Sequence, residues 1–229
     1  MKTTTSNLIR WAGLSAMVAG ICYVLVGLFH PLNVLASVTT PTWVIVHILA
    51  SAMCFFGLLG IVGLYARQAE KSGKLGLIGF GLWSVWLVLT FGFTFAETFI
   101  LPQLATVAPK SVEGFMGVFT GAPSEISFGV LPTLWSLIGL VYILGGLLFG
   151  IATFRAGVLP RWAGALLAFG TALTPLAALL PPELEPKVTV PVGLALAWMG
   201  YALLSEQREK ASESLPVKAS VQLGSSVAE

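Results

Sequence analysis

Six long apolar runs constrain the fold of this chain more than any other feature of its sequence. The run at residues 43–65 is about 23 residues long, and a helix of that length crosses a hydrocarbon core of roughly 30 Å. The composition agrees, because only 10% of the residues are charged, against about 25% in a soluble domain. We therefore expect an all-α membrane protein, a single bundle of six transmembrane helices. The expected spans are residues 11–29, 43–65, 75–101, 128–154, 162–180 and 188–204.

The first run begins after Lys2 and Arg10, as the apolar part of a signal peptide would. It is too long for such a segment, and no convincing small-residue cleavage site follows it. We therefore expect a retained first transmembrane helix.

The positive charges fall on alternate connections between the runs, and this predicts the orientation of the bundle. With a cytoplasmic N-terminus, ten of the twelve Lys and Arg residues lie inside, and only Lys110 and Lys187 lie outside. We therefore expect both termini in the cytoplasm, with residues 1–10 as a short N-terminal segment. Residues 205–229 have no apolar periodicity beyond their first turns, which predicts a disordered cytoplasmic tail. The inner set is Lys2, Arg10, Arg67, Lys71, Lys74, Arg155, Arg161, Arg208, Lys210 and Lys218.

Two further features concern helix packing and the surface. The longest connection, residues 102–127, contains Ser111 followed by apolar residues that share one helical face, which predicts a short helix lying on the outer membrane surface. Gly146 and Gly150 have the spacing that allows two helices to approach closely. The spacing fits packing within one chain and packing between two copies equally well.

Three polar residues fall at the same depth and form the candidate site. At 1.5 Å per residue, His30, His47 and Glu97 each lie roughly 30–34 Å from the basic end of their own run, at the outer boundary. Two imidazoles and a carboxylate can bind zinc or another divalent metal, and they can also transfer a proton. The alternative is that they form structural polar contacts, which cost little at a membrane boundary. We do not expect a haem, because both histidines would have to face one porphyrin.

A polar pocket beside these residues is a second expectation. Four of its members recur every three or four residues in the third run, so they share one face and can line a cavity leading down from Glu97. The alternative for this stripe is helix packing, with the threonines bonded to their own helix. Glu125 can also serve only to stabilise a helix N-terminus. The pocket candidates are Asn33, Trp83, Trp86, Thr90, Thr94 and Glu125.

The chain has no phosphate-binding glycine loop, no GxSxG and no HExxH motif, and no basic stripe that suggests nucleic acid. The segments Gly27-Leu28-Phe29-His30-Pro31 and Val46-His47-Ile48-Leu49, with residues 63–68 and 76–80, are similar to small bacterial multipass membrane proteins of uncharacterised function. The resemblance covers the first three runs. It implies a bacterial plasma membrane setting and no particular activity.

These observations favour a non-enzymatic membrane protein, either an accessory subunit or a protein that binds a small ligand or metal in an outward-facing polar pocket. The alternative is a metal-dependent membrane enzyme or a proton-coupled carrier that uses His30, His47 and Glu97. The expected partner is the lipid bilayer. A protein partner or a second copy remains open, and nucleic acid is not expected.

Overall fold

The computed structural model describes the backbone of residues 5–213 and the side chains of residues 7–206. Across these residues the chain is helical and contains no β-strand, which confirms the expected all-α class. The helices are α1 (Thr5–Phe29), α2 (Leu35–Val38), α3 (Pro41–Phe99), α4 (Leu101–Val107), α5 (Pro109–Thr120), α6 (Leu131–Ala156), α7 (Arg161–Leu173) and α8 (Val190–Glu213), with the 3-10 helices η1 (Thr174–Leu179) and η2 (Glu185–Thr189).

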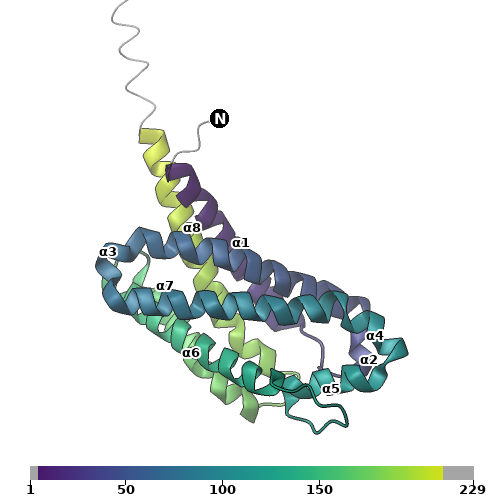
Figure 1. Cartoon of the computed structure of the whole chain (residues 1–229). Helices are drawn as coiled ribbons and strands as arrows, with labels where there is room; N and C mark the ends of the chain where they lie inside the picture. The colour runs from purple at the N-terminus through teal and green to yellow at the C-terminus, as the bar shows by residue number, and fades with distance from the viewer. Residues whose placement is uncertain (1–4, 214–229) are drawn as a thin grey trace, which may run out of the picture.

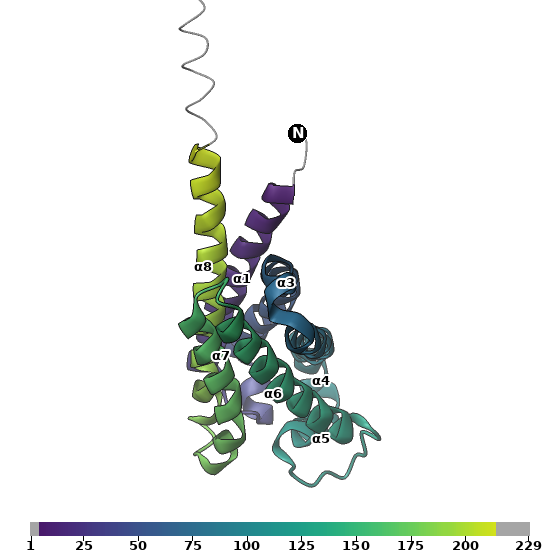
Figure 2. The same cartoon turned by 90° about the vertical axis from the view of Figure 1, so that its left-hand side faces the viewer.

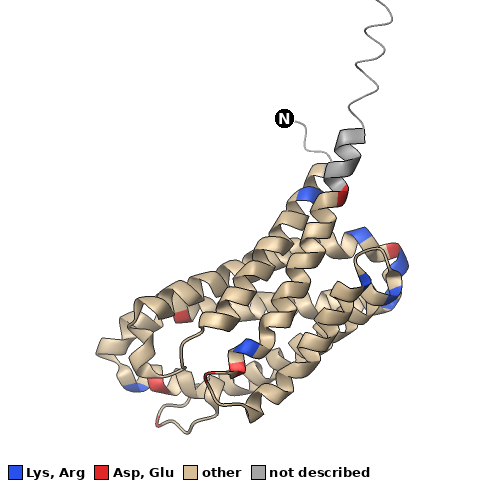
Figure 3. Ribbon diagram, turned by 180° about the vertical axis from the view of Figure 1, so that it is seen from behind, with Lys and Arg blue, Asp and Glu red and all other residues tan. Residues whose placement is uncertain are grey.

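Five helical segments in the described part of the chain are long and apolar enough to cross a membrane. The side chains on their outer faces are apolar, as a lipid environment requires. Lys, Arg and Glu residues lie mainly at the ends of the bundle (Figure 3). The five segments are Asn7–Phe29, Pro41–Phe99, Leu131–Ala156, Arg161–Leu179 and Glu185–Glu206.

The longest segment, α3, is folded back on itself. Gly73 has φ 59° and ψ −156°, a conformation that only glycine adopts readily, and the helix reverses there (Figure 1). The two arms, residues 41–72 and 74–99, run antiparallel. The indole Nε1 of Trp43 donates a hydrogen bond of 2.8 Å to the carbonyl oxygen of Glu97, so the far ends of the arms are in contact. The element α3 is therefore two helices joined at Gly73, and its arms correspond to the second and third apolar runs.

The bundle is held by pairs of closely packed helices. Helix α1 lies against α8 and α3, the arms of α3 pack on α6, and α6 packs on α7 (Figures 1 and 2). A Cβ atom at Gly20 would lie 2.4 Å from the backbone nitrogen of Ala197, so α1 and α8 meet backbone to backbone. On α6, a Cβ atom at Gly146 would lie 2.3 Å from Cγ2 of Thr171. A Cβ atom at Gly150 would lie 2.6 Å from the carbonyl oxygen of Gly164. Both α6 glycines thus face α7 of the same chain.

The connections differ in detail from the expected loops. The outer connection contains two short helices, α4 and α5, each with a proline in its first turn, where the missing N–H costs nothing. The apolar run at residues 162–180 is α-helical only to Leu173 and continues as the 3-10 helix η1, which contains Pro175. Helix α8 extends to Glu213, so it includes the start of the expected tail. Residues 214–229 of that tail lie outside the described residues.

Candidate functional site

Three of the predicted site residues meet where the two arms of α3 and the end of α1 come together. Nε2 of His47 lies 3.5 Å from Oε1 of Glu97, and the two side chains come from opposite arms. The ring of His30 lies next to them, with its centroid 5.1 Å from that of His47. His47 is 1% exposed and Glu97 is 7% exposed, so an ionisable pair is enclosed by protein at the end of a membrane bundle.

Trp43 positions His47 in two ways. Its indole stacks on the imidazole ring, with centroids 4.1 Å apart and planes inclined by 28°. Its carbonyl oxygen accepts a 2.7 Å hydrogen bond from Nδ1 of His47, one turn along the helix. Since the same indole also donates to the Glu97 backbone, Trp43 connects both members of the pair. Sequence analysis did not place Trp43 in the site, although its spacing of four residues from His47 was a signal for it.

The hydrogen bond to Trp43 determines which nitrogen of His47 carries hydrogen. A carbonyl oxygen only accepts, so Nδ1 must be the donor, and Nε2 is the nitrogen that faces Glu97. An unprotonated Nε2 opposite an ionised carboxylate would place two acceptors against each other. One proton between the two atoms would remove this repulsion, as imidazolium with carboxylate or as imidazole with carboxylic acid. At 3.5 Å the two atoms are not hydrogen-bonded, so the pair is not closed in this conformation.

A hydrogen bond also determines which nitrogen of His30 carries hydrogen. Its Nδ1 lies 2.7 Å from the carbonyl oxygen of Pro31 and so donates to it, which leaves Nε2 as the nitrogen with a free lone pair. Burial and, second to it, the nearby His47 lower the pKa of His30 to about 4. His30 is therefore neutral near pH 7 and can accept a hydrogen bond or bind a cation.

A second polar contact joins the arms of α3 one turn deeper in the bundle. The hydroxyl of Ser51 donates to Oγ1 of Thr94 across the arms at 3.1 Å. Thr94 in turn donates to the carbonyl of Phe91, and Thr98 donates to the carbonyl of Thr94. Thr90 is buried below them, and its Oγ1 has no hydrogen-bond partner in the described part of the chain. Polar side chains therefore continue from Glu97 into the bundle along one face of α3.

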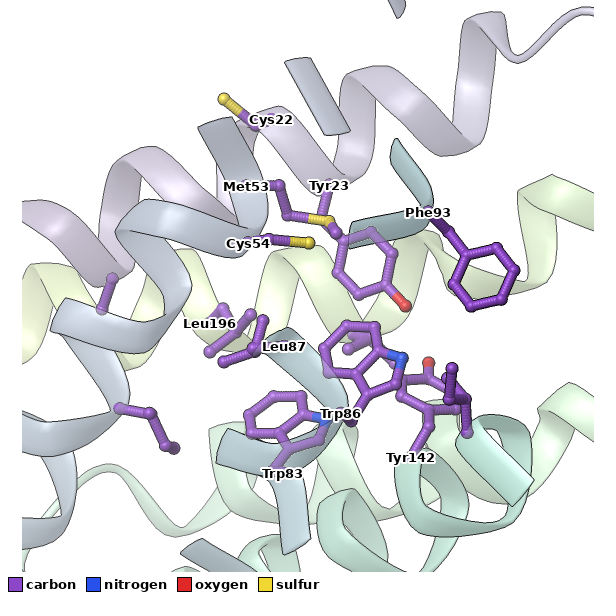
Figure 4. Close-up of a cluster of buried hydrophobic side chains, with 14 of the residues drawn as sticks. Cys22, Tyr23, Met53, Cys54, Trp83, Trp86, Leu87, Phe93, Tyr142 and Leu196 are labelled. Atoms are coloured by element: carbon purple, nitrogen blue, oxygen red, sulfur yellow. The ribbon is translucent and has the colours of Figure 1, made fainter. Parts of the chain in front are cut away.

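The tryptophans of this face lie in the aromatic core (Figure 4). Trp83 and Trp86 stack with centroids 5.8 Å apart, and Trp86 lies against Tyr142 of α6 at 4.7 Å and Tyr23 of α1 at 6.0 Å. The cavity between these rings and Met53 measures about 10 Å³, which holds at most one water molecule. In this conformation the rings fill the space below the histidines.

The remaining pocket candidates lie apart from the pair. Glu125 accepts a 2.7 Å hydrogen bond from Lys110 in the outer connection, and both side chains are mostly exposed. It is therefore a surface residue and not part of the buried group. Asn33 is half-buried between α1 and α2, and its Oδ1 is enclosed without a hydrogen-bond partner among the residues described.

Within residues 7–206, no group of three or more His, Cys, Asp and Glu side chains is arranged to hold a metal ion. Cys22 and Cys54 are both buried and free. At this site the geometry therefore provides the close ionisable pair of His47 and Glu97, with His30 beside it as a neutral base. Comparison with known protein families, with curated proteins and with solved structures finds no match to this chain.

Proposed function

We propose that this chain is a non-enzymatic, six-span protein of the bacterial inner membrane that binds a proton between His47 and Glu97. The observation that carries the proposal is the pair itself. Two buried ionisable groups face each other at 3.5 Å across the arms of α3, and the second nitrogen of the imidazole is already bonded to a carbonyl. Ionisable residues enclosed in a membrane bundle are costly, and they are retained mainly where they act.

The bound proton affects the contact between the two arms. With the proton present, a small closure brings Nε2 and the carboxylate into a charge-assisted hydrogen bond of about 2.7–2.9 Å. Without it, the lone pair of Nε2 and the carboxylate repel each other, and the hydrogen bonds from Trp43 and Ser51 are the remaining polar contacts between these ends of the arms. The pair is thus suited to a proton-dependent change at one face of the bundle rather than to catalysis.

The orientation forms part of the proposal. If each arm of α3 crosses the membrane once, the chain has six spans and both termini lie on one side. Arg67, Lys71 and Lys74 lie in α3 close to its turn at Gly73, whereas Lys110 lies in α5 and Lys187 in η2. The positive-inside rule then supports cytoplasmic termini and places the pair at the outer face.

The chain has only two histidines, which makes nuclear magnetic resonance the direct test. Protein labelled with ¹⁵N-histidine and reconstituted in nanodiscs gives one set of ring nitrogen signals for His30 and one for His47, assigned with His30→Asn. We expect the His47 set to show a protonated Nδ1 and a titration that changes in Glu97→Gln. The matched control, Glu125→Gln, changes a surface carboxylate and should leave the titration unaltered. A His47 titration that is the same in Glu97→Gln would contradict the proposal.

A second candidate function is the binding of a divalent metal, and the lone pair of His30 supports it. Nε2 of His30 is the nitrogen left free by the bond to Pro31, and the two imidazole rings lie 5.1 Å apart. A small rearrangement would bring both histidines and Glu97 to one ion. Elemental analysis of the purified protein beside His30→Ala, His47→Ala and Glu97→Ala tests this function. Stoichiometric zinc that all three folded variants lose would support it, and metal-free protein after growth with zinc would contradict it.

A further inference from the structure

A cavity of about 610 Å³ opens at the end of the bundle where α3 turns, away from His47 and Glu97. Three separate parts of the chain form its wall: α1, the end of the first arm of α3, and the connection between α6 and α7. Its volume lies within the range of roughly 300–1,000 Å³ that small-molecule sites have. The lining residues are Ile9, Ala66, Arg67, Gln68, Glu70, Lys71, Gly157 and Val158.

Arg67 is a fixed part of the wall. Its Nε and Nη2 donate to the two carboxylate oxygens of Glu206 on α8, both at 2.9 Å. This bidentate pair balances the charge of Arg67 and holds the end of the first arm against α8. Gln68, the next residue, is 1% exposed and donates through Nε2 to Thr153 of α6 at 2.9 Å. The first arm of α3 is therefore hydrogen-bonded to α6 as well.

Two other cations at the cavity have no ion-pair partner among the described side chains. Lys71 lines it, and no carboxylate among the described side chains lies within 4.0 Å of its ammonium group. Arg161 lies across Gly157, because a Cβ atom at Gly157 would be 2.8 Å from its Nε and 3.0 Å from its Nη2. Gly157 has φ 61° and lines the cavity, so the guanidinium of Arg161 sits at its edge. In the described part of the chain Arg161 has no ion pair either.

At this end of the bundle, cations outnumber carboxylates, although the carboxylate of Glu70 also lines the cavity. The described side chains at this end include six cations and two carboxylates, and the concentration of Lys and Arg is visible in Figure 3. A cavity with an excess of one charge raises the local concentration of ions of the opposite sign. The cations are Arg10, Arg67, Lys71, Lys74, Arg155 and Arg161, and the carboxylates are Glu70 and Glu206.

Two exposed tryptophans indicate that the cavity lies at the membrane boundary. Trp11 on α1 is 63% exposed and Trp162 on α7 is 71% exposed, and each follows directly on an arginine at this end of the bundle. Tryptophan is enriched at the level of the lipid headgroups. The cavity is therefore open at the depth where phosphate groups of lipids are found.

We propose that this cavity binds a phosphate group, carried either by a lipid headgroup or by a soluble phosphate compound. Lys71 supplies a compact ammonium charge, and the guanidinium of Arg161 supplies parallel N–H donors that suit phosphate oxygens. Arg67 keeps its bond to Glu206 and positions the wall. The site shares no residue with the His47–Glu97 pair, so it stands whether or not that pair binds a proton.

The test is ligand-induced thermal stabilisation of the detergent-purified full chain, because a ligand that binds only the folded state raises the unfolding temperature. One set of measurements adds phosphatidylglycerol, and a second set adds glycerol 3-phosphate or inorganic phosphate. The test variant is Lys71→Gln combined with Arg161→Gln. The control is Lys74→Gln together with Arg155→Gln, which removes the same charge at the same end but no residue that lines the cavity or lies against it.

We expect a saturable rise in the unfolding temperature with the lipid or with the soluble phosphates. The affinity for that ligand should be reduced at least tenfold in the test variant and nearly unchanged in the control. A rise with the lipid alone assigns the site to a headgroup, and a rise with both soluble phosphates assigns it to a soluble compound. Equal loss in test and control variants would overturn the proposal, since general charge would then explain it. No stabilisation by the lipid or by the soluble phosphates would also overturn it. If the double variant fails to fold, Lys71→Gln alone, at an exposed position, gives the same comparison.

Discussion

Substituting Gly150 by alanine tests the close contact between α6 and α7 that supports the second arm of α3. The new Cβ atom would lie 2.6 Å from the carbonyl oxygen of Gly164 and 2.7 Å from the backbone nitrogen of Ala168. Ordinary contacts of this kind begin at 3.4 Å, and both neighbours are backbone atoms that cannot rotate away. The helices would have to separate by about 0.8 Å along the first of these contacts.

Gly139 provides a matched control on the same helix. A Cβ atom at Gly139 would meet no other atom within 4 Å, so Gly139→Ala changes helix propensity without changing packing. Replacing glycine by alanine inside a helix stabilises it by up to about 1 kcal/mol. Overpacking of a tight contact costs about 1–3 kcal/mol. We therefore expect Gly150→Ala to unfold at a lower temperature than the parent chain, by about 2–4 °C for each kcal/mol, and Gly139→Ala at an equal or higher temperature.

The two cysteines make the measurement direct. Cys22 is 7% exposed and Cys54 is 1% exposed, and the chain has no other cysteine. A thiol-reactive fluorescent dye therefore reports unfolding in detergent as these side chains become accessible. Equal unfolding temperatures for Gly150→Ala and Gly139→Ala would show that α6 and α7 do not approach as closely as described here.

Three further stability outcomes can be measured, the first by tryptophan fluorescence, since a thiol-reactive dye needs the thiolate and fails at acid pH, and the other two with the same dye. Burial lowers the pKa of His30 to about 4 from an ordinary value of 6.5, so the unfolded chain binds this proton at a higher pH than the folded chain. The contribution of His30 to the free energy of unfolding is therefore full above pH 6.5 and falls as the pH drops toward 4, and this fall should be absent in His30→Asn. Thr153→Val should cost about 1–3 kcal/mol, since it leaves the buried amide of Gln68 without its partner, and adding Gln68→Leu should recover part of that loss. Lys110→Ala should change stability by less than about 0.5 kcal/mol, because its ion pair with Glu125 is exposed, and a larger change would mean that the outer connection is more tightly packed than its exposure indicates.

The helical class of this chain was predictable because the lipid leaves the backbone no other partners. Apolar runs of membrane-spanning length must satisfy their N–H and C=O groups internally, and within a single run only a helix does so. The ends of the helices were less predictable. Hydropathy falls at Arg67, but the helical backbone conformation continues through Ser72 and is interrupted only at Gly73, where φ becomes positive. Apolarity indicates where lipid contact ends, whereas backbone conformation determines where a helix ends.

The candidate site was predictable in depth but not in its lateral contacts. The rise per residue places His30, His47 and Glu97 at one level whatever their neighbours are. Their meeting depends on the reversal at Gly73 and on the rotation of each arm, and the sequence specifies neither. Trp43 shares a helical face with His47 in the sequence, but this spacing alone assigned no role to its side chain. In the structure its side chain is fully buried and bonded to the opposite arm.

The place of the His47–Glu97 pair within α3 also bears on what the proposed proton binding can change. Near the turn at Gly73 the two arms are joined covalently, and Tyr65 and Phe80 stack across them with planes inclined by only 10°. At the other end the arms are linked by the hydrogen bonds from Trp43 and Ser51 and by the open contact between His47 and Glu97. Because the turn joins the arms covalently, we expect a change in that contact to move the ends of the arms more than the turn. A proton bound there would therefore act on the surface around His30, where its effect can be transmitted to whatever binds at that face.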